Sequence, residues 1–220
     1  MTMSSPARTD ALTAFRDLTR EPAVAVVVSD LDGVLRRFPE DLWPSLDAEL
    51  GLAPGRLRRI VLRHPILAEV STGRATHRQW REAVVATLAA EGLAPQAAEA
   101  AVQRWATTPA TIDPAVQALL REAEGTGRPA FVFTNGTDQV RAELTALGLG
   151  ELAHGDRLLN SAELGAAKPD PEAYARALAR IEAVLGRRVE PATIAFLDDG
   201  PGNVTAARAA GWRAVHLPAH

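Results

Sequence analysis

Residues 24–35, Val-Ala-Val-Val-Val-Ser-Asp-Leu-Asp-Gly-Val-Leu, are the stretch that decides the fold. The run at 24–28 is apolar throughout and rich in valine, so it has no polar face. Such a run is typical of a strand buried on both sides, as in a parallel sheet covered by helices. Asp30, Asp32 and Gly33 follow, where ligands bind in open α/β sheets, just beyond the carboxyl end of a strand. Asp and Gly are also common in ordinary turns, so this stretch does not identify a site by itself.

The composition is that of a soluble globular protein, with 220 residues, 47% hydrophobic and 23% charged. A net charge of −3 gives no basic field for nucleic acid or an anionic membrane, so we expect neither as a partner. The absence of cysteine excludes disulfides, thiolate catalysis and cysteine-ligated metals, and fits the predicted cytoplasmic location. Residues 1–20 lack the apolar core of a signal peptide, and we expect a loose tail with a short helix over Asp10–Leu18.

Helical periodicity replaces the valine-rich runs between residues 39 and 110. Trp80, Val84 and Leu88 recur every fourth residue, after Thr76 as a candidate N-cap. We expect a small cap of about four helices, inserted after the first strand. The predicted domains are therefore a tail at 1–20, a core at 21–38 and 111–220, and a helical cap at 39–110.

From residue 113 onward, helical segments alternate with short apolar runs. The runs that we expect to be strands are 130–133, 157–159, 193–197 and 214–217. Alternation of strands and helices predicts an α/β fold with a doubly wound, Rossmann-like parallel sheet.

Polar residues follow several of these strands or lie in a loop between them. They are Asp30, Asp32, Thr134, Asn135, Lys168, Asp198 and Asp199. The carboxyl ends of parallel strands share one edge, where crowded acids would raise one another's pKa unless a cation compensates them. An all-oxygen ligand set favours Mg²⁺, and a lysine and a hydroxyl beside it would receive phosphate oxygens. The predicted chemistry is phosphoryl transfer to a carboxylate nucleophile.

Four motifs occur in a fixed order along the chain. They are Asp-Leu-Asp-Gly-Val at 30–34, Thr-Asn-Gly at 134–136, Lys-Pro-Asp-Pro at 168–171 and Leu-Asp-Asp-Gly-Pro-Gly-Asn at 197–203. This order resembles the haloacid dehalogenase-like (HAD) hydrolase superfamily, in particular a phosphatase-type member with a helical cap after the first motif. The resemblance extends from about residue 23 to residue 217.

The resemblance implies a role for each catalytic residue. Asp30 corresponds to the nucleophile, and Asp32 to the general acid that later activates water. Thr134 would donate its hydroxyl to the substrate phosphate, with backbone N–H groups around Asn135 and Gly136 assisting.

The resemblance also implies a lysine and a metal site. Lys168 would bind the phosphate and offset the negative charge around it. The implied Mg²⁺ ligands are Asp30, Asp32 through its backbone carbonyl, Asp198 and Asp199, with Asp199 either a direct ligand or a support. Asn203 is interpreted as positioning Asp198 or Asp199. Asp170, before Pro171, is interpreted as a helix N-cap.

Charged and aromatic residues in the cap have two interpretations. A basic cluster could attract an anionic substrate, but a solvated helix face is favoured; its residues are Arg56, Arg58, Arg59, Arg63 and His64. Trp80, with Arg74, His77 and Arg81 nearby, could stack on a sugar, but a core tryptophan is favoured. One of Arg36, Arg37 and Phe38 could reach the leaving group from the link to the cap.

The predicted function is a Mg²⁺-dependent phosphatase acting on a small phosphorylated metabolite. Sugar phosphates, phosphoglycolate and nucleotides are the candidate substrate types. A phosphosugar mutase of the same superfamily is an alternative and would differ in its product. A catalytically silent binding protein with the same fold is the other alternative. The sequence does not indicate an oligomeric state.

Overall fold

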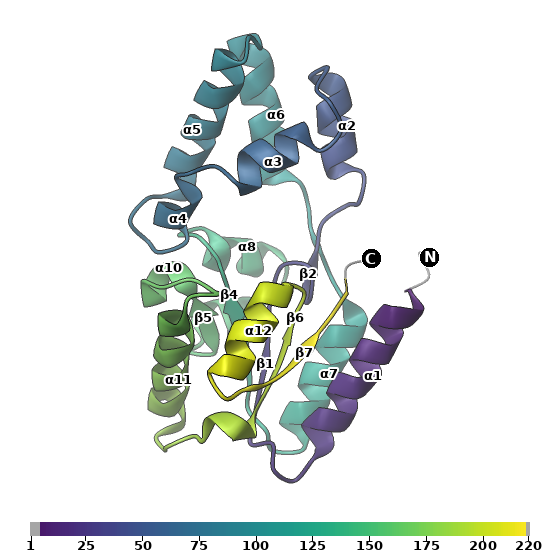
Figure 1. Cartoon of the computed structure of the whole chain (residues 1–220), viewed down its shortest axis with the longest axis vertical. Coiled ribbons are helices and arrows are strands. Elements are labelled where there is room, and N and C mark those ends of the chain that lie inside the picture. The colour runs from purple at the N-terminus through teal and green to yellow at the C-terminus, as the bar shows by residue number, and fades with distance from the viewer. Residues whose placement is uncertain (1–4, 219–220) are drawn as a thin grey trace.

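The computed structural model of the chain describes residues 5–218. It has two parts, an α/β core and a group of helices that lies beyond one end of the core (Figure 1). A five-stranded sheet in the order β5-β4-β1-β6-β7 forms the centre of the core, and all its neighbouring strands are parallel. The strands are β1 (Val26–Ser29), β4 (Ala130–Thr134), β5 (Leu158–Asn160), β6 (Ile194–Asp198) and β7 (Arg213–His216). The predicted doubly wound parallel sheet is therefore confirmed.

The central strand β1 is buried on both faces, as its valine run predicts. Val28 lies opposite Phe131 of β4 and Phe196 of β6 in register. Side chains of a strand alternate between the two faces, so Val27 packs into one apolar cluster while Val26 and Val28 pack into the other.

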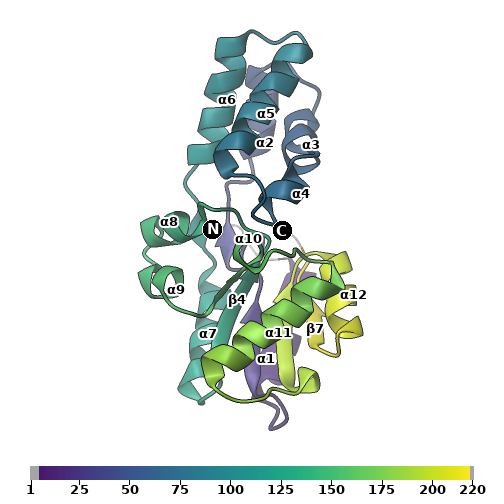
Figure 2. The ribbon, with the colours of Figure 1, turned by 90° about the vertical axis from the view of Figure 1, so that its left-hand side faces the viewer.

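Helices cover both faces of the sheet (Figures 1 and 2). One cluster is formed with α1 (Pro6–Arg20), α7 (Pro114–Gly125), α8 (Val140–Ala146) and α9 (Gly150–His154). The other is formed with α11 (Pro171–Leu185) and α12 (Pro201–Ala209). The short elements α10 (Ser161–Leu164) and η1 (Pro191–Thr193) complete the core.

The cap contains five helices with an apolar core of their own. They are α2 (Leu42–Glu49), α3 (Arg56–Leu62), α4 (Leu67–Val70), α5 (His77–Ala90) and α6 (Pro95–Thr107). Trp80, Val84 and Leu88 of α5 are buried in this core, and Thr76 caps α5 in a reciprocal capping box with Gln79. The cap thus has five helices where about four were expected.

The cap is connected to the core by a small antiparallel ribbon. The chain leaves the core through β2 (Arg36–Arg37) and returns through β3 (Thr111–Ile112), and these two strands pair with each other. Two-residue strands are too short to show a hydrophobic period, so the sequence did not predict them. The ribbon places the segment that leaves the core for the cap beside the segment that returns from it.

The expectation of a loose tail over residues 1–20 is wrong for the residues that are described. Ser5 is the N-cap of α1 and Pro6 its first residue, and α1 runs unbroken to Arg20. Phe15 is fully buried against the core, so this helix is part of the fold. Its apolar stripe is narrow, which made the segment look polar. Residues 1–4 lie outside the described part of the chain.

Within residues 5–218, none of the helices combines the length and the hydropathy needed to cross a bilayer.

Candidate active site

Three neighbouring strands deliver polar side chains to one edge of the sheet. Asp30 follows β1, Thr134 ends β4 and Asp198 ends β6. All three residues are buried. Because β1 lies between β4 and β6, Asp30 is at the centre of this edge.

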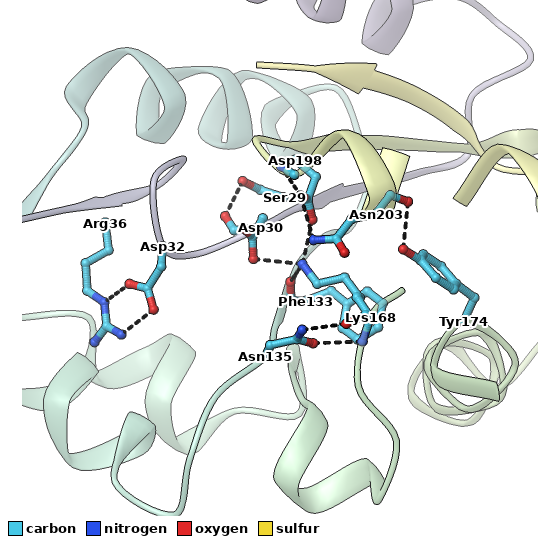
Figure 3. Close-up of polar contacts among 11 residues, drawn as sticks. Ser29, Asp30, Asp32, Arg36, Phe133, Asn135, Lys168, Tyr174, Asp198 and Asn203 are labelled. Atoms are coloured by element: carbon cyan, nitrogen blue, oxygen red, sulfur yellow. Dashed lines mark hydrogen bonds and ion pairs between the residues drawn. The ribbon is translucent and has the colours of Figure 1, made fainter. Parts of the chain in front are cut away.

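Lys168 connects the buried carboxylates (Figure 3). Its Nζ donates to Asp30 Oδ1 at 2.8 Å, to Asp198 Oδ2 at 2.6 Å and to the Phe133 carbonyl at 2.9 Å. The ammonium also lies 5.0 Å from the centroid of the Phe133 ring. All three N–H groups of this buried cation therefore have acceptors, which is the condition for burying a charge at tolerable cost.

Asp198 is held by donors from the chain that follows it. Its Oδ1 accepts from the Gly200 N–H at 2.7 Å and from Asn203 Nδ2 at 2.9 Å, while Oδ2 faces Lys168. Asn203 is in turn fixed by α12, and its carbonyl accepts from the Tyr174 hydroxyl at 2.7 Å. The prediction that Asn203 positions Asp198 is confirmed.

The cluster carries more negative than positive charge. The pKa of Asp30 is raised to about 7 as the net result of burial, which raises it most, the charge of Lys168, which lowers it, and the neighbouring carboxylate of Asp198, which raises it. Burial, followed by the charge of Asp198, also raises the pKa of Asp199. Burial opposes the charge on Lys168, but Asp30 and Asp198 outweigh it and raise the pKa of the ammonium. A further cation would relieve this imbalance.

The three acids could hold a metal ion together. Asp30, Asp198 and Asp199 each offer an oxygen, and these oxygens all lie within 4.8 Å of one another. Oxygen donors alone, with a local excess of negative charge, fit Mg²⁺. Gly33 makes room for Asp199, since a Cβ on Gly33 would lie 2.2 Å from Asp199 Oδ2.

Asp32 does not join this cluster in the structure. Both its carboxylate oxygens accept from Arg36, at 2.6 Å from Nε and 2.9 Å from Nη2 (Figure 3). Nη1 of Arg36 donates to Glu143 at 2.6 Å. Burial opposes the charge on Arg36, but the hydrogen bonds and charges of Asp32 and Glu143 outweigh it and raise the pKa of Arg36.

The remaining predicted residues lie around the Lys168 loop. Asn135 uses its side chain to hold that loop, donating to the Lys168 carbonyl at 2.7 Å and accepting from the Lys168 N–H at 2.8 Å. Gly136 is buried, and a Cβ there would lie 2.7 Å from Asn160 Oδ1. Asp170 accepts from the Glu172 N–H at 2.9 Å, which confirms it as the N-cap of α11.

The cap residues follow the simpler of the two interpretations. Trp80 is buried and donates from Nε1 to the Val61 carbonyl at 3.1 Å, so it is a core residue. Arg58, Arg59 and Arg63 are exposed, as expected for a solvated helix face. Phe38 is 41% exposed beside Arg36.

Several residues near the site were not singled out from the sequence. Ser29 donates to the Asp30 carbonyl at 2.7 Å, and Glu143 pairs with Arg36. Asp138 accepts from the His77 N–H at 2.7 Å and so joins the cap to the core. Asp138 lies in the loop between β4 and α8, and a polar residue in a loop after a buried strand is the signal that the sequence offers for it.

Comparisons with known proteins agree with this geometry. A family model described as haloacid dehalogenase-like hydrolase matches residues 24–211. Among curated proteins, Validoxylamine A 7'-phosphate phosphatase from Streptomyces hygroscopicus subsp. limoneus is 32% identical over 108 residues. The match covers 49% of this chain and 46% of that protein, so it spans less than half the length of this relative.

Solved structures share the fold over most of the chain. A HAD family enzyme from Bacteroides thetaiotaomicron, in complex with magnesium and inorganic phosphate, gives a TM-score of 0.63 at 16% identity. That match covers 88% of this chain and 93% of the enzyme. The L-2-haloacid dehalogenase from Xanthobacter autotrophicus gives a TM-score of 0.57 at 27% identity, covering 87% and 76% of the two chains. The same fold thus occurs in an enzyme crystallised with magnesium and inorganic phosphate and in a haloacid dehalogenase.

Proposed function

Since the chain belongs to the haloacid dehalogenase-like hydrolase family, we propose that it is a Mg²⁺-dependent phosphatase of small phosphate monoesters, with Asp30 as nucleophile. The observation that carries this proposal is the buried group of Asp30, Lys168 and Asp198 at the edge of the sheet. A carboxylate oxygen at the end of β1, beside a fixed ammonium, is suited to attack a phosphorus whose oxygens the ammonium binds. Bound Mg²⁺ would neutralise charge on the phosphate and on the carboxylates.

The first step joins phosphorus to a carboxylate oxygen of Asp30 and breaks the bond to the leaving oxygen. Asp32 donates a proton to that oxygen as it leaves. Water then attacks phosphorus, Asp32 takes the proton, and inorganic phosphate departs with the Asp30 carboxylate restored. The Thr134 hydroxyl holds a phosphate oxygen, and Lys168 exchanges one of its present acceptors for another phosphate oxygen. This sequence requires Asp32 to turn from Arg36 towards the substrate.

Two features favour a phosphatase over a dehalogenase. Asp32 supplies the second carboxylate, which the dehalogenases of this family lack. The relative from Streptomyces hygroscopicus subsp. limoneus is named as a phosphatase of a phosphorylated small molecule. We therefore propose a small phosphorylated metabolite as substrate, of the sugar phosphate, phosphoglycolate or nucleotide type. A phosphosugar mutase would use the same residues and is recognised by an isomeric phosphate product in place of inorganic phosphate.

The test is hydrolysis of p-nitrophenyl phosphate by the wild type with Mg²⁺, with EDTA, and by Asp30→Asn. We expect activity only in the first case, because the other two lack the metal or the nucleophile. Asp170→Asn is the matched control, since asparagine is an equally good N-cap and Asp170 lies outside the acidic cluster. Activity in EDTA, together with turnover of an L-2-haloacid, would instead favour a dehalogenase. A screen of phosphorylated metabolites then identifies the substrate.

A further inference from the structure

Arg8 is fully buried although it lies on α1, outside the residues that the family model matches. Its guanidinium contacts three segments that are distant in sequence. Nη2 donates to the Asp113 carboxylate at 2.9 Å, and Nη1 donates to the carbonyls of Pro218 at 3.2 Å and Gly33 at 3.4 Å. One side chain thus joins the N-terminal helix, the segment after β7, the loop after β1 and the start of α7.

Two of these segments, the loop after β1 and the start of α7, lie next to parts of the proposed active site. Gly33 directly follows Asp32, has a φ of 83° and lies against Asp199. Its N–H donates to the Arg36 carbonyl at 2.9 Å, so the Gly33 peptide helps to fix the loop that carries Asp32.

Asp113 lies where the chain returns from the cap. It follows β3, its N–H donates to the Leu35 carbonyl at 2.9 Å, and its side chain caps α7. Leu35 directly precedes β2, so Asp113 holds the two strands of the connecting ribbon at their base. Arg8 therefore contacts both the loop that carries Asp32 and the connection to the cap.

We propose that Arg8 is a positioning residue that fixes the Gly33 loop relative to the connection to the cap, and thereby orients Asp32. A helix that only had to be anchored could use an apolar side chain, as Phe15 does on the same helix. A guanidinium is costly to bury, but its planar fork fixes several oxygens in one geometry. The kinetic consequence rests on the proposed phosphatase reaction, while the effect on the loop does not.

The variants are Arg8→Met, which keeps length without the donors, and Arg8→Lys, which keeps charge without the fork. Phe15→Leu is the control, because it loosens the same helix and Phe15 belongs to the apolar core. The first measurement is hydrogen exchange of the peptide covering residues 31–37 at a temperature where each variant is folded. We expect faster exchange in both Arg8 variants and wild-type exchange in Phe15→Leu. Unchanged exchange in Arg8→Met, or equally fast exchange in Phe15→Leu, would overturn the proposal.

The second measurement compares phenyl phosphate with p-nitrophenyl phosphate. Phenolate, the stronger base, needs more help from a proton donor than p-nitrophenolate does. If Arg8 orients Asp32, Arg8→Met lowers kcat for phenyl phosphate about 10- to 100-fold and for p-nitrophenyl phosphate less. Equal losses on both substrates would overturn the role in orienting Asp32. A wild type that hydrolyses neither ester would refute the phosphatase instead, and hydrogen exchange would still decide the role of Arg8.

Discussion

Asp30→Asn should stabilise the metal-free protein at pH 8 while abolishing activity. Burial raises the pKa of Asp30 from 3.8 to about 7, so the folded protein binds this proton more tightly than the unfolded chain does. Between these pH values the folded state therefore holds more protons, and stability falls as pH rises. At about 1.4 kcal/mol per pH unit, the stability lost by pH 8 is about 4 kcal/mol.

The net gain in the free energy of unfolding from Asp30→Asn is smaller than the stability that the wild type loses by pH 8. An asparagine at position 30 still accepts a hydrogen bond from Lys168, but the ammonium loses one of its two carboxylates. We expect a gain of about 2 kcal/mol at pH 8, or about 4–8 °C in Tm for a chain of this size, and almost none at pH 5.

The assay is urea unfolding in EDTA at several pH values between 5 and 8.5, with Asp170→Asn as the control. That control replaces an exposed carboxylate and should not change the pH dependence. Saturating Mg²⁺ should raise the stability of the wild type at pH 8 more than that of Asp30→Asn. An Asp30→Asn protein that is less stable than the wild type at pH 8, or a difference that does not grow with pH, would refute this reasoning.

Three further substitutions test other parts of the site. Lys168→Met leaves two buried carboxylates without their cation, so the free energy of unfolding in urea should fall by about 3–5 kcal/mol at pH 8 and by less at pH 5. A loss of stability that is the same at both pH values would contradict the electrostatic cause. Gly33→Ala brings a methyl group against the Asp199 carboxylate and imposes a positive φ on alanine. The affinity for Mg²⁺, measured by calorimetry, should therefore fall about tenfold. An unchanged affinity would argue against Asp199 as a metal ligand. Asp138→Ala removes the acceptor of the His77 N–H, a contact that joins the cap to the core, and should raise KM about fivefold with little change in kcat. An unchanged KM would mean that this contact does not hold the cap against the core.

The buried runs of the sheet could be predicted because their apolar residues are consecutive. The run at 130–133 is one residue shorter than β4, and the run at 193–197 is displaced by one residue from β6. Asn203 could be placed near Asp198 because it follows Asp198 by five positions, in the first turn of α12 just beyond the end of β6. These features depend on local sequence.

The elements that were missed depend on tertiary contacts. The stability of α1 comes from a few apolar residues that meet the core, and Arg8 looks like a surface residue until its three acceptors are assembled. The β2–β3 ribbon pairs residues that are far apart in the sequence; Arg37 and Thr111, for example, are 74 positions apart. Each of its strands is only two residues long. The pairing of Asp32 with Arg36 depends on how the loop turns after β1, which its sequence does not specify.

The most direct test of the central claim is to trap the covalent intermediate. Acid quenching during turnover of a phosphate monoester, followed by borohydride reduction, converts an aspartyl-phosphate to homoserine. Cleavage after Arg20 and Arg36 yields the peptide 21–36 for mass spectrometry. We expect homoserine at position 30 in the wild type and none in protein quenched without substrate. Homoserine at another aspartate, or steady turnover with Asp30 unlabelled, would contradict it.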